Sequence, residues 1–178
     1  MRPAARRGAH APSARGLLAV GCAVVTVSDT RRGAADLSGN LAARLLERGG
    51  HRVAVRAWVK DEPAAIRRAV RGALVRRDVD AVLVTGGTGM APRDRTPEAL
   101  APLVERWMPG FGELYRALSF EQVGAAAWFS RAAAGVARGR LLIMLPGSTR
   151  AVELAVRHLI LPELVHAART LGRFPPEE

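Results

Sequence analysis

The sequence predicts an α/β fold of three layers (α/β/α), in which helices cover both faces of a mostly parallel sheet. Almost continuously apolar segments of strand length alternate with segments of helical periodicity, which is typical of a parallel sheet buried by helices. A length of 178 residues suits one domain, and hydrophobic residues make up 49% of it. We therefore divide the chain into an Arg/Ala-rich tail over residues 1–16, expected to be flexible, and one α/β domain over residues 17–178.

The expected strands and helices follow one another along the chain. Continuous or alternating apolar residues predict strands at Ala19–Ser28, His51–Val59, Ala81–Thr85 and Leu141–Leu145. Capping residues and apolar periodicity predict five helices. The first is capped by Ser38 and ends at Gly49, and the second is capped by Asp61 and runs to about Arg77. The third opens at Thr96, the fourth spans Gly112–Val123, and the last is a long helix with a kink at Pro162.

The loops after the strands are expected at one edge of the sheet, because crossovers between parallel strands are right-handed. That edge collects Ser28–Leu37, Gly86–Thr96 and Pro146–Arg150. Ligands of open α/β sheets bind at this edge, so functional residues are expected there.

The glycine-rich run TGGTGMAPRDRTPE at residues 85–98 carries the strongest pattern. Gly86, Gly87 and Gly89 allow the backbone to turn tightly and to approach an anion without Cβ atoms in the way. Backbone N–H groups and the hydroxyl of Thr88 can then cradle phosphate oxygens. The alternative is a tight turn that precedes a helix cap.

Charged residues in the same run indicate the kind of ligand. Arg93 adds a fixed positive charge, and Asp94 is the carboxylate that would hold Mg²⁺ beside bound phosphates. The run lacks the Gly-Lys-Ser/Thr of a Walker loop, and Pro92 stands where the dinucleotide fingerprint needs a glycine.

The loop after the first strand adds two carboxylates, Asp29 and Asp36, with Ser28 and Ser38 at its ends. Carboxylates from different loops can share one divalent cation, so these acids are candidates to act together with Asp94. Two alternatives stay open: Asp29 as a turn residue, and Asp36 as an acid that complements the dipole of the following helix.

The loop after the last strand begins with Pro146, Gly147 and Ser148. Free N–H groups at the start of a helix can bind an anion, and the alternative is an ordinary capped helix start.

Charge and composition restrict the function classes. The net charge of +11 favours an anionic ligand, although an arginine-rich composition with solvated faces would also produce it. Nucleic acid is disfavoured as a partner because aromatic residues make up only 4% and no nucleic-acid motif occurs. The four histidines show no metal spacing and none falls on the loop edge, which disfavours a covalent Ser–His–Asp mechanism.

The chain is expected to be cytoplasmic. Cys22 is the single cysteine, so no internal disulfide can form, and we interpret it as a buried thiol. The apolar run Leu17–Val27 is shorter than the roughly 20 residues of a membrane span. A secretory signal is the alternative for this run, but its apolar pattern continues past Cys22 as in a buried strand.

Taken together, these segments resemble the MoaB/MogA family of molybdenum-cofactor biosynthesis proteins. The matching stretches are VTVSD at 25–29, DLSG at 36–39, VTGGTGMAPRDRTPEA at 84–99, MPGFGE at 108–113, LS at 118–119, SR at 130–131 and LPGSTRA at 145–151. The resemblance implies a molybdopterin-binding fold, a homotrimer or hexamer, and a role beside other molybdenum-cofactor biosynthesis proteins. It also implies molybdopterin adenylyltransferase activity, with ATP and molybdopterin as substrates and Mg²⁺ as cofactor. The alternative within the family is a non-catalytic, molybdopterin-binding protein of the MoaB type.

The resemblance also implies roles for single residues. Asp36 and Asp94 would be the catalytic acids and would hold Mg²⁺. The remaining residues of the implied substrate and nucleotide site are Ser28, Ser38, Gly86, Gly87, Thr88, Gly89, Arg93, Glu113, Pro146, Gly147 and Ser148.

Overall fold

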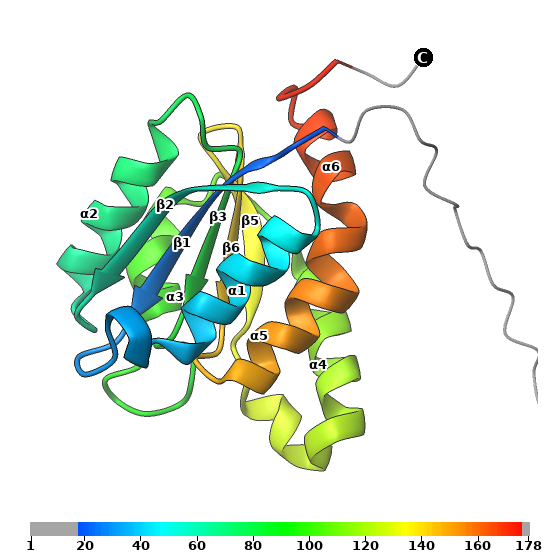
Figure 1. Cartoon of the computed structure of the whole chain (residues 1–178). Coiled ribbons are helices and arrows are strands. Elements are labelled where there is room, and N and C mark those ends of the chain that lie inside the picture. Colours follow the sequence, from blue (N-terminus) through cyan, green and yellow to red (C-terminus); the bar gives the residue numbers. More distant parts are fainter. Residues whose placement is uncertain (1–17, 176–178) are drawn as a thin grey trace, which may run out of the picture.

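A computed structural model describes residues 18–175, and the tail expected over residues 1–16 lies outside this range (Figure 1). The sheet has six strands in the order β2-β1-β3-β6-β5-β4. Its parallel part consists of β1 (Gly21–Val27), β2 (Arg52–Val59), β3 (Ala81–Thr85) and β6 (Arg140–Leu145). At the other side, β5 (Ala133–Ala137) is antiparallel to β6, and β4 (Arg106–Trp107) is antiparallel to β5. The prediction of a mostly parallel sheet is confirmed.

Helices cover both faces of this sheet, which makes the three layers visible in Figure 1. One face carries α1 (Leu37–Arg48), α4 (Pro109–Val123), α5 (Thr149–Ala155) and α6 (Leu161–Thr170). The other face carries α2 (Pro63–Leu74) and α3 (Thr96–Leu100). Short 3-10 turns at Gly33–Ala35, Ala101–Leu103 and Gly124–Phe129 complete the chain.

The central strands alternate their side chains between two apolar cores. Leu83 and Ile143 face the core beneath α1, α5 and α6, whereas their neighbours Val84 and Met144 face the core beneath α2 and α3. These side chains are almost completely buried, and each contributes roughly 1.5–3 kcal/mol through burial. The glycine loop begins at Gly86, directly after the last residue of β3.

Several element boundaries differ from the sequence prediction. Asp36, not Ser38, is the N-cap of α1, because its Oδ1 accepts the N–H of Gly39 at 2.9 Å. The N-cap position of α2 is Glu62, without a side-chain cap, and the helix ends at Leu74 rather than near Arg77. Asp61 is therefore free of the capping role predicted for it.

The last helix and the antiparallel strands also depart from expectation. A π-helical turn at Val156–Ile160 joins α5 to α6 just before Pro162, which lacks the N–H that a regular α-helix would need there. Strand β5 was not predicted, because Ala133–Ala137 reads AAGVA and alanine and glycine have low strand propensity. Strand β4 was not predicted because its two residues are too few to show a periodic pattern. Within residues 18–175, no helix is long and apolar enough to span a membrane.

Candidate functional site

A cleft of about 620 Å³ opens at the carboxyl edge of the parallel strands. The loops after β1, β3 and β6 form its walls, together with Asp61 after β2 and with Phe129 and Ser130 before β5. The structure brings together most of the residues predicted for the site, namely Ser28, Gly86, Gly87, Thr88, Gly89, Arg93, Asp94, Pro146, Gly147 and Ser148.

The glycine loop owes its shape to two residues with positive φ, Gly86 at 107° and Gly87 at 65°. A Cβ atom at Gly86 would collide with the carbonyl oxygen of Val27, and one at Gly87 would collide with Thr96. Thr96 also holds both glycines, since its hydroxyl donates to the Gly86 carbonyl at 2.8 Å and its N–H donates to the Gly87 carbonyl at 2.9 Å. Only glycine fits these two positions of the loop.

Two polar atoms in the cleft are buried and have no hydrogen-bond partner within the described chain: Oδ1 of Asp61 and Oγ1 of Thr88. Buried polar groups in proteins are nearly always paired, and an unpaired one calls for a functional or structural explanation. Two of them in one cleft indicate a ligand that supplies the missing partners. Thr88 was predicted for the site, whereas Asp61 was not.

Asp61 lies beside Gly87, close enough to Asp94 that the two carboxylates influence each other. Burial raises the pKa of Asp61 above its usual range, and the negative charge of Asp94 raises this pKa further. Asp94 is anchored within its own loop, because its Oδ2 accepts the N–H of Ala91 at 2.9 Å. A divalent cation between Asp61 and Asp94 would relieve this repulsion.

Asp29 links the two sides of the cleft. Its Oδ1 accepts the N–H of Asp61 at 3.1 Å, and its Oδ2 forms an ion pair with Arg93. Asp29 therefore binds both the backbone of Asp61 and the guanidinium of Arg93, and this ion pair keeps Arg93 at the cleft. These contacts go beyond the alternative role of Asp29 as a turn residue.

Asp36 does not line this cleft, so the described structure does not bring its side chain together with that of Asp94. The side chain is fully buried, and Arg56 pairs with its Oδ2 at 2.8 Å. The same oxygen accepts the hydroxyl of Thr26 at 2.6 Å and the indole N–H of Trp58 at 3.0 Å. Burial by itself would raise the pKa of Asp36, but the hydrogen bonds from Thr26, Gly39 and Arg56 outweigh it and lower this pKa. Both oxygens are engaged, so Asp36 joins α1 to β1 and β2.

Two further predicted site residues lie outside the cleft. Ser38 is buried beside Asp36, to whose Oδ1 it donates at 3.3 Å. Glu113 lines a separate hollow of about 350 Å³ next to Trp107 and Arg116. Ser148 lines the cleft but is also the N-cap of α5, where its Oγ accepts the N–H of Ala151 at 3.2 Å.

The cleft offers few protein ligands to a metal ion. Among residues 18–175, no group of three or more histidine, cysteine or acidic residues is arranged to hold one. Mg²⁺ is usually bound by one or two carboxylates together with substrate phosphates and water, so a two-carboxylate site suits it. Asp61 and Asp94 could serve in this way, whereas the third acid of the cleft, Asp29, already pairs with Arg93.

Comparison with known proteins is consistent with this geometry. Residues 23–166 match the family described as "Probable molybdopterin binding domain". The chain is 48% identical to molybdenum cofactor biosynthesis protein B of Bacillus subtilis over 155 residues, covering 86% of this chain and 91% of that protein. The corresponding protein of Halalkalibacterium halodurans is 48% identical over 153 residues, covering 85% and 90%. A crystal structure of a molybdenum cofactor biosynthesis protein B superposes with a TM-score of 0.87 at 42% identity, covering 90% of this chain and 100% of the other.

Proposed function

The chain belongs to the molybdopterin-binding domain family of molybdenum-cofactor biosynthesis proteins, and on that premise we propose that it is a molybdopterin adenylyltransferase. The reaction joins ATP and molybdopterin, in the presence of Mg²⁺, to give adenylyl-molybdopterin and pyrophosphate. One observation carries the proposal: Asp61 and Thr88 each leave a buried oxygen without a partner in the same cleft, beside a glycine loop suited to phosphate.

The cation that this nucleotidyl transfer needs fits the residues of the cleft. Oδ1 of Asp61 is buried and has no hydrogen-bond partner in the described structure. Burial raises the pKa of Asp61, and the charge of Asp94 raises it further. A cation bound between the two carboxylates would favour their ionised forms. Asp61 and Asp94 would hold Mg²⁺, with Asp61 taking the place first proposed for Asp36. Bound there, the cation would offset negative charge on the phosphates of ATP.

The side chains of the cleft would perform the remaining tasks. The molybdopterin phosphate is already a nucleophile, so no protein group has to remove a proton. The glycine loop and Thr88 would orient the phosphates through N–H and O–H donors, and Arg93 would stabilise charge that develops on the leaving pyrophosphate. Pro146 and Gly147 would close the site from the loop after β6.

A second candidate function is molybdopterin binding without turnover. The relatives reported above are all named protein B, and the family resemblance also allows a non-catalytic, molybdopterin-binding protein of the MoaB type. This candidate also requires the cleft and the glycine loop, but it requires neither ATP nor a cation at Asp61 and Asp94.

We also propose that the protein self-associates and that it acts in the cytoplasm. Helix α4 and the following turn expose large apolar side chains, including Leu114, Phe120 and Trp128, which are 59%, 61% and 70% exposed. Exposed apolar side chains are typical of protein interfaces, which supports self-association. The homotrimer or hexamer remains the state that the family resemblance implies. We expect the protein to act in the cytoplasm beside other molybdenum-cofactor biosynthesis proteins, with molybdopterin and ATP as its small-molecule partners.

Pyrophosphate release tests the proposal directly. Purified protein is mixed with molybdopterin, ATP and Mg²⁺, and release is followed with and without each component. The adenylyltransferase requires all three. Molybdopterin binding measured by calorimetry, with no pyrophosphate under any condition, would instead identify the non-catalytic function.

A further inference from the structure

Arg131 forms hydrogen bonds to the glycine loop from outside the cleft. Its Nε donates to the Gly89 carbonyl at 3.1 Å, and its Nη2 donates to the Asp94 carbonyl at 2.6 Å. Its backbone N–H donates to the Thr88 carbonyl at 3.3 Å, and its Nη1 pairs with Glu98 at the start of α3. One residue thus contacts the loop at both ends of the segment that carries Asp94.

The position of Arg131 separates it from the residues that would touch a ligand. Its neighbours Phe129 and Ser130 line the cleft, whereas Arg131 lines two adjoining hollows of about 420 and 350 Å³ and not the cleft itself. An effect of Arg131 on ligands would therefore have to pass through the glycine loop.

The geometry of these contacts suits arginine in particular. A planar guanidinium presents several N–H donors in fixed directions, so it can hold the Gly89 and Asp94 carbonyls at the same time. A lysine ammonium is a point charge at the end of a flexible chain and would not fix both carbonyls in one arrangement.

The carbonyl contacts should outweigh the ion pair with Glu98. The side chain of Glu98 is 56% exposed and that of Arg131 is 31% exposed, and exposed ion pairs contribute little because water screens them. The two carbonyls, in contrast, belong to Gly89 and to Asp94 itself, whose carboxylate is tied to the same loop through the N–H of Ala91.

We propose that Arg131 is a positioning residue that sets the shape of the glycine loop, and through it the placement of the Asp94 carboxylate. The proposal rests on the proposed function only where a reaction is measured. It assigns a task to a side chain that the mechanism above leaves unused.

The first test needs no ligand. Hydrogen exchange is measured by mass spectrometry on peptides that cover residues 87–96, in the wild type, Arg131→Ala and Arg131→Lys, with peptides of α2 as an internal reference. We expect exchange in the loop to become about 10-fold faster in Arg131→Ala, with a smaller increase in Arg131→Lys, while α2 stays unchanged. Equal exchange in the loop of all three proteins overturns the proposal.

The second test follows pyrophosphate release from ATP and molybdopterin. Residues that orient a metal-binding carboxylate typically affect activity about 10- to 100-fold, so kcat should fall by that factor in Arg131→Ala, with a smaller change in KM. Millimolar guanidinium should restore part of kcat in this variant and none in Asp94→Asn. A loss of folded protein would also lower the apparent kcat at constant KM, but added guanidinium would not restore it, so the rescue is the readout that a stability defect does not reproduce.

Two controls separate the contacts. Glu98→Gln removes the charged partner but leaves the carbonyl contacts, so its kcat should fall far less than that of Arg131→Ala. Arg157→Ala removes an exposed arginine that pairs with Glu153 on α5, and its kcat should equal that of the wild type. A loss in Glu98→Gln as large as that in Arg131→Ala overturns the proposal in favour of the ion pair. If the wild type releases no pyrophosphate, the proposed function fails, and hydrogen exchange still decides the role of Arg131.

Discussion

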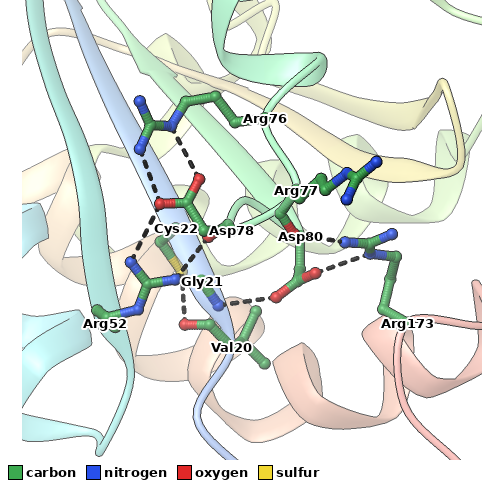
Figure 2. A network of polar contacts seen from close by, with 9 residues as sticks. All are labelled: Val20, Gly21, Cys22, Arg52, Arg76, Arg77, Asp78, Asp80 and Arg173. Carbon is green, nitrogen blue, oxygen red and sulfur yellow. Dashed lines mark hydrogen bonds and ion pairs between the residues drawn. The ribbon is translucent and has the colours of Figure 1, made fainter.

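At the edge where the parallel strands begin, the carboxylate of Asp80 is held on both sides, by the N–H of Gly21 at 2.9 Å and by Nε of Arg173 at 2.7 Å (Figure 2). Arg52 and Arg76 hold Asp78 in the same network. At the opposite edge, where the strands end, Asp61 has a buried oxygen without a partner in the described structure.

Arginines also satisfy the backbone at the first edge. The carbonyl oxygens of Arg77, Asp78 and Val79 accept hydrogen bonds from Arg173, Arg52 and Arg140, respectively. The loop between α2 and β3 is thereby fastened to β2, β6 and the end of α6.

The two edges differ in whether their buried carboxylate oxygens have hydrogen-bond partners. The partly buried pair of Asp80 with Arg173 stabilises the native fold, whereas the buried, unpaired oxygen of Asp61 at the carboxyl edge reduces stability. Buried groups without a partner and with a shifted pKa are typical of functional sites, and proteins often give up stability to keep them. The substitutions Asp80→Asn and Asp61→Asn should therefore change the free energy of unfolding in opposite directions.

The largest expected effect is on the reaction. Asp94→Asn and Asp61→Asn each remove a carboxylate proposed to hold Mg²⁺, and we expect pyrophosphate release to fall about 100-fold. Asp78→Asn is the matched control at the amino edge and should retain the wild-type rate. A wild-type rate in Asp94→Asn would remove this acid from the mechanism.

The next effect concerns Asp36, an acid at the carboxyl edge whose oxygens are already paired. Asp36→Asn should lower the free energy of unfolding by about 2–3 kcal/mol at neutral pH, because it weakens a buried network. The pKa of Asp36 is lowered in the folded state, so its stabilisation is present above the unfolded pKa of about 4 and is lost as the pH falls through the lowered pKa. Urea unfolding of both proteins at pH 7 and pH 3 measures this. An equal gap at both pH values would contradict the assigned ionisation.

Asp80→Asn should cost about 1–2 kcal/mol, since the amide weakens the contact to Arg173 while it can still accept the N–H of Gly21. The rate per folded molecule should stay at the wild-type value, because the network lies at the edge opposite the cleft. Thermal unfolding together with pyrophosphate release checks both parts. A lower rate at temperatures where the variant is fully folded would show that the two edges are coupled.

The smallest expected effect is a gain in stability in Asp61→Asn. The raised pKa of Asp61 means that its ionised form is disfavoured in the folded state, so removing the charge should stabilise the protein by about 0.5–1 kcal/mol. The wild type bears this penalty once the pH rises above the raised pKa, and the gain should vanish as the pH falls below the ordinary pKa of an aspartate. Urea unfolding without ligands, from pH 3 to pH 8, should show the gain only in the upper part of the range. A loss of stability at neutral pH would mean that Asp61 has a structural partner after all.

Local patterns in the chain were enough to predict the layers, the parallel strands and the glycine loop. Continuous apolar runs such as Ala81–Thr85 predict buried strands, and a run of glycines after a strand predicts a tight turn, because both depend on neighbouring residues alone. Thr88, Arg93 and Asp94 were predicted for the site because they lie within that one loop.

Long-range contacts decided the roles of the individual acids. Asp36, like Asp94, follows a parallel strand in the sequence, but Arg56 and Trp58 on β2 donate hydrogen bonds to its Oδ2. Asp61 was interpreted as a helix cap, although its place directly after a parallel strand was a signal that it could face the ligand edge. Whether a carboxylate is paired or left open depends on side chains that the fold brings from distant segments, and no local pattern contains that information.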